Sequence, residues 1–349
     1  MLIVDLFCGA GGLHIGFKEA GYRIGLSVDN NENVKRTHLY NHPFVPFWNR
    51  DIREIDTNEI REVIDYESLD GIIGGPPCQG FSTIGRRVSS KPEVRNTYDP
   101  RNELVDEYIR LVRELQPKFF LMENVKGILT WDKGEFINNI IEKFKGCGYT
   151  VDYKLINMAD YGVPQTRERV FILGNRLNQP VSFPASTHSD SPKDGLKPWV
   201  GCWDSIKDLV NHEEDPGFNH VPLKHTEKNI ERYKLIPEGG RLPEDALPPE
   251  LYRKNFGNTF KRLGRKKPAL TMVPGNDAFP IHPILNRSLT VREAARIQTF
   301  PDNIIFKGNR RQQGHQVGNA VPPLFSKILA RHIKENILKE KQLEFQFND

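Results

Sequence analysis

The sequence has 349 residues, 38% of them apolar, so the chain can bury a sizeable core in one large or two smaller domains. The net charge of +4 is mildly basic and gives only weak support for an anionic partner. Four widely spaced cysteines without a CxxC pair argue against a disulfide framework and a zinc site. The N-terminus has no basic leader, and no stretch approaches the length of a membrane span. We therefore expect a cytoplasmic protein without a metal or a membrane partner.

Short β-rich apolar runs alternate with helical patterns up to about residue 180, at 2–7, 23–28, 71–73, 119–122, 150–156 and 170–173. This alternation predicts an α/β fold, with a mostly parallel sheet and helices on both faces. Prolines, glycines and histidines then become frequent, which indicates a smaller, loop-rich domain. After Pro322-Pro323, the apolar spacing predicts a helix to about residue 342 that packs back on the first domain. We assign the first domain to 1–181 and 314–349, and the second to 182–313.

A glycine-rich turn, residues 5–12, directly follows the first predicted strand and precedes a helical pattern from residue 13 to residue 20. Such a turn lets a nucleotide-like ligand approach the backbone where the helix begins. The turn also fits a dinucleotide, although the GxGxxG fingerprint is not matched. Asp29, at the end of the second strand, can accept from ribose hydroxyls, and Asp51 can bind an adenine amino group. An acid of this kind, taken alone, is more often a turn or cap residue than a ligand-binding one.

A single thiol, Cys78, follows two glycines and two prolines at the end of an apolar run. The prolines fix the φ angles that lead into the cysteine, and the glycines allow close backbone approach. A lone cysteine is more often a small buried side chain than a catalyst. This rigid setting nevertheless favours a nucleophile.

Two further polar groups accompany predicted strands. Glu123, followed by Asn124, ends an apolar run, and a carboxyl there can donate a proton or a hydrogen bond in a partly dry cleft. The alternative is a helix cap at Asn124 with Glu123 paired to an arginine. Arg167 and Arg169 stand two residues apart on a predicted strand edge, so both should point the same way and bind an anion or a carbonyl. The alternative is a solvated charge run.

These motifs occur in the order found in the DNA (cytosine-5)-methyltransferases, and the chain resembles that family except in a variable region from about 182 to 285. The matching segments are Asp5-Leu6-Phe7-Cys8-Gly9-Ala10-Gly11-Gly12, Pro76-Pro77-Cys78-Gln79, Glu123-Asn124-Val125, Gln165-Thr166-Arg167-Glu168-Arg169, Arg292-Glu293-Ala294-Ala295-Arg296-Ile297-Gln298-Thr299-Phe300-Pro301 and Gln316-Val317-Gly318-Asn319-Ala320-Val321-Pro322-Pro323. The resemblance implies a Rossmann-like S-adenosylmethionine-dependent methyltransferase domain with a smaller target-recognition domain. With no regulatory extension before the first strand, it suggests the prokaryotic restriction-modification type.

The resemblance also implies a mechanism in which the thiolate of Cys78 attacks carbon 6 of a flipped cytosine. Glu123 would hold and protonate ring nitrogen 3, and Arg167 would contact the ring carbonyl. Arg167 and Arg169 would together favour the thiolate. Carbon 5 would then receive the methyl group, leaving S-adenosylhomocysteine as the other product. The implied cofactor residues are Phe7, Gly9, Gly11, Asp29, Asp51, Pro77, Leu104 and Asn319. Asp29 is shorter than the glutamate common in the family, and Leu104 lies in a loosely matching segment.

Basic residues suggest where DNA binds. Arg86 and Arg87 follow the nucleophile in a segment, 79–101, that we interpret as a lid over DNA. A basic run from 253 to 267, which includes Lys266 and Lys267, should track phosphates, and Thr271 is placed like a phosphate-contacting threonine of the family. The histidines at 212, 220 and 225 lack the acids or cysteines expected of a metal site.

The leading hypothesis is a monomeric, sequence-specific methyltransferase acting on double-stranded DNA that contains a short target motif, with a restriction endonuclease for the same site as a candidate partner. The same motifs also serve a tRNA cytosine methyltransferase in a few relatives. A catalytically inactive DNA-binding protein is a third reading, against which Cys78, Glu123 and Arg167 argue together. The hypothesis of a dehydrogenase is supported only by the glycine-rich turn.

Overall fold

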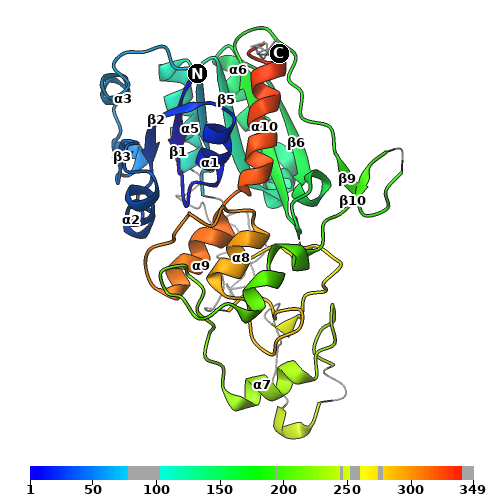
Figure 1. Cartoon of the computed structure of the whole chain (residues 1–349). Coiled ribbons are helices and arrows are strands. Elements are labelled where there is room, and N and C mark those ends of the chain that lie inside the picture. Colours follow the sequence, from blue (N-terminus) through cyan, green and yellow to red (C-terminus); the bar gives the residue numbers. More distant parts are fainter. Residues whose placement is uncertain (78–102, 194, 244–246, 252–259, 274–277, 340–349) are drawn as a thin grey trace, which may run out of the picture.

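The computed structural model describes residues 1–77, 103–193, 195–243, 247–251, 260–273 and 278–339. An upper lobe holds the central sheet and both described ends of the chain, and a smaller lobe with helix α7 (Glu227–Lys234) extends below it (Figure 1). Within the described ranges, the helices are all too short or too polar to cross a membrane.

The described residues form a seven-stranded sheet with the order β3-β2-β1-β4-β5-β8-β6. The strands are β1 (Leu2–Leu6), β2 (Arg23–Val28), β3 (Phe47–Trp48), β4 (Gly71–Gly74), β5 (Phe119–Val125), β6 (Thr150–Asn157) and β8 (Glu168–Asn175). Neighbours from β3 to β5 are parallel, whereas β8 runs antiparallel to both β5 and β6. The predicted, mostly parallel sheet is confirmed. Strand β3 was not predicted, because two residues are too few to show a period.

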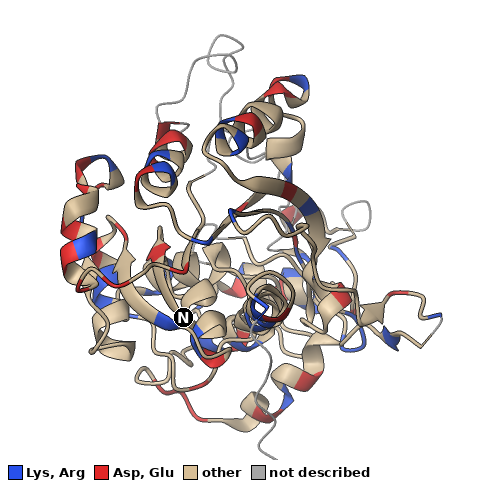
Figure 2. Cartoon of the chain, turned by 90° about the horizontal axis from the view of Figure 1, so that it is seen from above, with Lys and Arg blue, Asp and Glu red and all other residues tan. Residues whose placement is uncertain are grey.

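Helices cover both faces of the sheet, and Lys, Arg, Asp and Glu positions are spread along them (Figure 2). One face carries α1 (Gly12–Glu19) and α10 (Pro323–Asn336), and the other carries α3 (Thr57–Val63), α5 (Glu103–Leu115) and α6 (Glu135–Gly146). Successive residues of β1 alternate between the two apolar cores: Leu2 and Val4 pack on the α5 side, and Ile3 packs on the α1 side. This two-residue period fixes which side chains reach each core.

The last helix completes the core of the first domain. A Cβ atom on Gly16 would lie 2.3 Å from Cβ of Ser326, and one on Gly12 would lie 2.0 Å from the carbonyl oxygen of Val321. Glycine is therefore required at both positions for α1 to approach α10. The predicted terminal helix does pack back on the first domain, but it ends at Asn336 rather than near residue 342.

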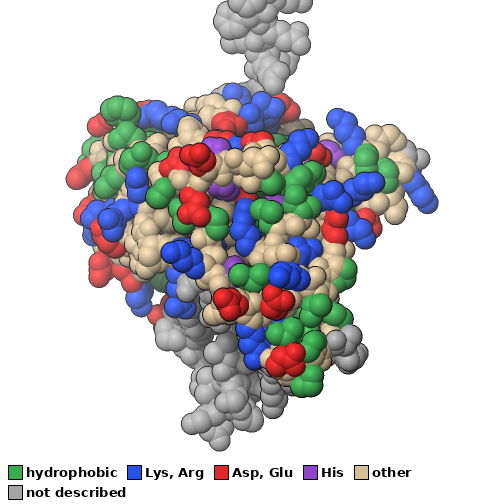
Figure 3. Space-filling view, turned by 60° about the horizontal axis from the view of Figure 1, so that its bottom comes forward, with side chains coloured by type: hydrophobic (Ala, Val, Ile, Leu, Met, Phe, Trp, Pro, Cys, Tyr) green, Lys and Arg blue, Asp and Glu red, His purple; other side chains and the backbone are tan. Residues whose placement is uncertain are grey.

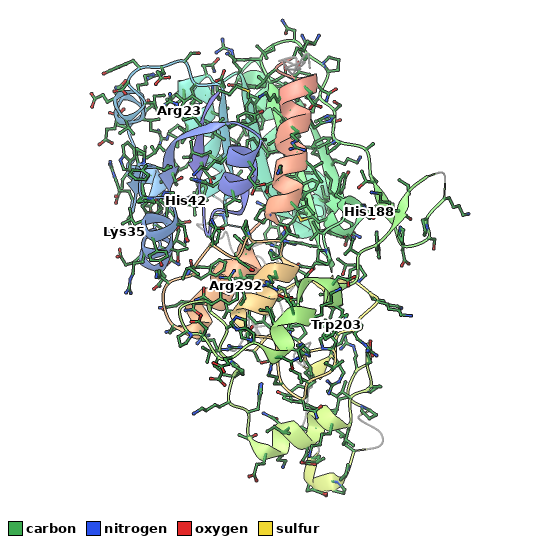
Figure 4. The ribbon with its side chains drawn as sticks, in the orientation of Figure 1. Arg23, Lys35, His42, His188, Trp203 and Arg292 are labelled. Carbon is green, nitrogen blue, oxygen red and sulfur yellow. The ribbon has the colours of Figure 1, made fainter. Side chains whose placement is uncertain are left out.

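The lower lobe joins the sheet through a third apolar core built around α8 (Val291–Ile297) and α9 (Arg310–Asn319). Arg292 of α8 is fully buried and donates to the carbonyl oxygens of Phe218, at 2.9 Å, and Ile304, at 2.6 Å, which ties α8 to two loops (Figure 4). Short elements complete the fold: α2 (Glu32–Asn41), β7 (Gln165–Thr166), β9 (His188–Ser189), β10 (Lys197–Pro198), β11 (Ala269–Leu270), and the 3₁₀ helices η1 (Ile52–Glu54), η4 (Lys126–Leu129), η5 (Trp131–Gly134), η6 (Met158–Tyr161), η7 (Cys202–Ser205), η8 (Lys207–Asn211) and η10 (Pro249–Leu251).

Candidate active site

The turn between β1 and α1 bends sharply at three of the predicted cofactor residues. Phe7, Gly9 and Gly11 have φ angles of 56°, 51° and 83°, and Gly11 is the N-cap of α1. A Cβ atom on Gly9 would have no neighbour within 4 Å, so the space beside this backbone is open. The turn therefore presents an accessible backbone at the start of a helix, where partial positive charge favours polar or anionic ligands.

Two acids lie beside this turn. Asp29 accepts from the backbone N–H of Gly9 at 3.0 Å and from that of Asn31 at 2.9 Å, and burial raises its pKa. Asp5 is fully buried in β1, and neither of its carboxylate oxygens has a hydrogen-bond partner among the described residues. Burial, followed by the charge of Asp29, raises the pKa of Asp5 well above its usual range. Two unpaired buried acceptors are unusual in a folded protein and point to a polar ligand.

The buried thiol of Cys8 has a different character from a nucleophile. Its pKa is raised well above the usual value, first by burial and then by the neighbouring charges of Asp29 and Asp5. A cysteine in such surroundings is inert, because the thiolate is the reactive form.

The remaining predicted cofactor residues lie on separate elements. Asp51 caps η1, as the alternative interpretation of this acid predicted. Its carboxylate also pairs with Arg53 at 2.6 Å, which lowers the pKa of Asp51. Leu104, on α5, packs half-buried against the core on that face, and Pro77 is half-buried after β4. Asn319 is exposed at the end of α9. Among the described residues, no hydrogen bond or ion pair joins these side chains to Gly9 or Asp29.

Glu123 and Arg169 form an ion pair on the same side of two antiparallel strands. Arg169 Nε lies 2.9 Å from Glu123 Oε1, and the two side chains are only 15% and 12% exposed. A Cβ atom on Gly75 would lie 3.0 Å from Glu123 Oε2, so this glycine leaves room for the carboxylate. Strand β5 continues through Asn124, which donates to the Pro76 carbonyl at 3.4 Å and caps no helix. The pair thus stands beside the loop that leads to residue 78.

Arg167 lies elsewhere, and the expectation that both guanidiniums point the same way is wrong. Arg167 falls between β7 and β8, is fully buried, and donates to the carbonyls of Gly318 at 2.9 Å and Asn319 at 3.2 Å. The strand is interrupted at this residue, so the two-residue period does not extend across it. Carbonyls at the end of α9 lack intrahelical partners and attract a cation.

Of the residues predicted to bind DNA, three are described. Lys266 and Lys267 are exposed, whereas Thr271 is half-buried and its hydroxyl donates to the Thr166 carbonyl at 2.7 Å. On the face seen in Figure 3, Lys and Arg side chains are mixed with Asp and Glu. Cys78, Arg86 and Arg87 lie outside the described residues, as does the predicted lid.

The lower-lobe histidines make hydrogen bonds within the protein. His220 Nδ1 lies 3.1 Å from the Thr290 hydroxyl, and His225 Nε2 lies 3.1 Å from that of Ser288. Across the described parts of the chain, no three His, Cys, Asp or Glu residues are grouped so as to hold a metal ion.

Sequence reasoning missed a buried cluster of three histidines beside the turn. The ring of His14, in α1, stacks on the ring of His42 with 4.0 Å between the ring centroids. The ring centroid of His38 lies 5.4 Å from that of His14 and 5.3 Å from that of His42. Burial lowers the pKa of His14 to about 2 and those of His38 and His42 to about 4. Figure 4 labels His42, which follows the last residue of α2. The spacing of His38 and His42 by four residues signals one helix face, but nothing in the sequence shows that His14 joins them.

The sheet, with its antiparallel strand β8 and a glycine turn at the carboxyl ends of the parallel strands, defines a Rossmann-like methyltransferase. The family model for C-5 cytosine-specific DNA methylases matches residues 1–335, and the chain belongs to this family. It is accordingly a DNA (cytosine-5)-methyltransferase.

Individual relatives agree. Type II methyltransferase M.DdeI of Desulfomicrobium norvegicum is 34% identical, over 97% of this chain and 90% of that protein. Type II methyltransferase M1.HphI of Haemophilus parahaemolyticus is 35% identical, over 96% of this chain and 86% of that protein. Among solved structures, a prophage-encoded E. coli protein assigned as a DNA modification methyltransferase superposes with a TM-score of 0.75 at 27% identity, covering 97% of this chain and all of that one.

Proposed function

We propose that the enzyme methylates carbon 5 of a flipped cytosine within a short motif of double-stranded DNA, through a covalent bond to Cys78. The observation that carries this proposal is the pair of Glu123 and Arg169 beside Gly75, which opens the loop leading to Cys78. The pair offers a carboxyl group and a guanidinium in a mostly buried setting, which suits the polar edge of an extruded base.

The chemistry assigns one task to each group. The thiolate of Cys78 adds to carbon 6, which makes carbon 5 nucleophilic. Glu123 holds ring nitrogen 3 and supplies a proton there, so that negative charge does not accumulate on the ring. After methyl transfer, loss of the carbon 5 proton and elimination free Cys78.

Arg169 is a better candidate than Arg167 for the contact with the ring carbonyl. Arg169 keeps some exposure and lies against Glu123, which is to bind the same ring. Arg167 is fully buried, and its two terminal nitrogens donate to the carbonyls of Gly318 and Asn319. We therefore assign base contact to Arg169 and support of the site to Arg167.

The residues of the β1 turn fit S-adenosylmethionine, which when bound supplies the methyl group for carbon 5. The unpaired acceptors of Asp5 suit the donors of its amino-acid part, and Asp29 retains lone pairs for ribose hydroxyls. Asp51, Pro77, Leu104 and Asn319 complete the predicted set. We expect Asp5→Asn to weaken S-adenosylmethionine binding in calorimetry on purified protein; unchanged affinity would remove Asp5 from the site.

The cellular setting is also part of the proposal. The similar Type II methyltransferases support action on DNA alongside a restriction endonuclease for the same site. We propose a monomer that works in a prokaryotic cytoplasm.

The decisive experiment is bisulfite sequencing of plasmid DNA from a methylation-free host that expresses the protein. Methylation at one short motif is expected. Cys78→Ser should abolish it while leaving DNA binding intact, and residual normal turnover would refute the nucleophile. Methyl transfer to tRNA but not to duplex DNA would overturn the proposed substrate.

Two lysine variants test the roles of the arginines. Arg169→Lys should mainly lower kcat and change the free energy of unfolding little. Arg167→Lys should mainly lower the free energy of unfolding.

A further inference from the structure

Two buried glutamines take part in hydrogen bonds that link four separate parts of the chain. Gln165, in β7, and Gln298, directly after α8, are both fully inaccessible to solvent. Gln165 Nε2 donates to Gln298 Oε1, and Gln298 Nε2 donates to the Ala320 carbonyl at 2.5 Å. Gln165 Oε1 accepts from the backbone N–H of Met272 at 3.2 Å. We call Met272, Gln165, Gln298 and Ala320 the amide relay.

The relay has one direction. Each glutamine uses its oxygen as the acceptor and its nitrogen as the donor, so rotating either amide would bring like groups together. A buried polar group left without a partner costs about 1–3 kcal/mol. The relay thus favours one relative placement of its four segments.

The segment that carries Gln165 also carries the active-site arginine. Strand β7 pairs with β11 of the lower lobe, and Thr166 Oγ1 donates to the Ala269 carbonyl at 3.1 Å. Thr271, next to the relay residue Met272, donates back to the Thr166 carbonyl. Three residues after Thr166, Arg169 reaches Glu123. A shift of β11 should therefore move the start of β8, which carries Arg169 and its ion pair with Glu123.

We propose that Gln165 and Gln298 are positioning residues, which hold the lower lobe and the end of α9 in register with the pair of Glu123 and Arg169. Neither glutamine touches the base. Their effect is exerted through β7, so that the lobe placed on the DNA target and the site that receives the cytosine move as one body. This inference rests on the proposed roles of Glu123 and Arg169.

The test uses Gln165→Met and Gln298→Met, which keep side-chain length and remove both polar atoms. Because a small misplacement of reacting groups can cost up to about 100-fold in rate, we expect kcat to fall about 10- to 100-fold. The KM for S-adenosylmethionine and the affinity for target DNA should stay unchanged. Fluorescence of 2-aminopurine at the target position should still report base extrusion, while the rate of adduct formation on 5-fluorocytosine DNA should fall with kcat. The double variant should lose little more than either single one, since both break the same relay.

Matched measurements separate positioning from stability. Gln313→Met is the control, because Gln313 donates a hydrogen bond to the Gly308 carbonyl and is not part of the relay. This variant should keep the wild-type kcat. Gln298→Asn keeps the amide but shortens its reach, and it serves if the methionine variants do not fold. Folded variants with wild-type kcat and adduct rate would overturn the inference, as would a fall in kcat matched by weaker DNA binding. Failure of the wild-type protein itself to form the adduct would instead refute the proposed function.

Discussion

The histidine cluster predicts acid sensitivity of the fold. His14, His38 and His42 are neutral when buried, with pKa values of about 2, 4 and 4, and ionise near 6.5 when unfolded. Their folded pKa values lie below the unfolded value, so the unfolded state takes up protons first as the pH falls. Stability is therefore complete above pH 6.5 and is lost progressively as the pH falls toward 4.

The magnitude follows from these pKa values. Between pH 8 and pH 5, protonation of each histidine in the unfolded state should lower the free energy of unfolding by about 2 kcal/mol. Three together reach at most about 6 kcal/mol, which is comparable with the whole stability of many domains.

Urea unfolding at pH 8, 7, 6 and 5 measures this loss. His42→Phe keeps the stacking on His14 and removes one titrating ring, so its loss between pH 8 and pH 5 should be about 2 kcal/mol smaller than that of the wild type. His212→Phe, at an exposed ring, is the control and should keep the wild-type slope. An identical pH dependence in His42→Phe and the wild type would refute the reasoning.

Three further outcomes are expected. Gly75→Ala should push the Glu123 carboxylate, which lies 3.0 Å from the added Cβ, and lower kcat about tenfold without changing S-adenosylmethionine affinity; kcat equal to wild type would contradict the contact. Gly146→Ala, in α6 with nothing within 4 Å, should leave kcat unchanged and raise the free energy of unfolding by up to about 1 kcal/mol, measured in urea. Replacing Lys266 and Lys267 by Ala should weaken DNA binding and lower its salt slope by up to about 2; an unchanged slope would exclude them from the phosphate interface.

The sequence was most informative where a strand lies at the centre of the sheet. Strand β2 was predicted at its observed bounds, and β1 and β4 to within one residue, because buried central strands are apolar runs. Strand β5 extends three residues beyond its predicted end at Met122, through Glu123 and Asn124. Polar side chains ended the apolar run there, although the backbone ladder with β8 continues.

Side-chain direction in the site was harder to predict. Arg167 and Arg169 stand two residues apart, which predicts that both point the same way. Arg167 instead donates to carbonyls at the end of α9, which lie 151 and 152 residues later in the sequence. The partners of Gln165, near residues 272 and 298, are likewise invisible to local patterns. Local rules locate the motifs, and contacts between distant segments decide what each side chain faces.

The packing of α10 on α1 has a consequence during synthesis. Leu13 and Phe17 of α1 leave the ribosome near the start of translation, but Phe325 and Leu329, which belong to the same apolar core, follow about 300 residues later. Until then, one face of the nascent sheet is uncovered, and such surface is prone to aggregation. We therefore expect the first domain to become protease-resistant only once α10 has left the ribosome and packed on α1.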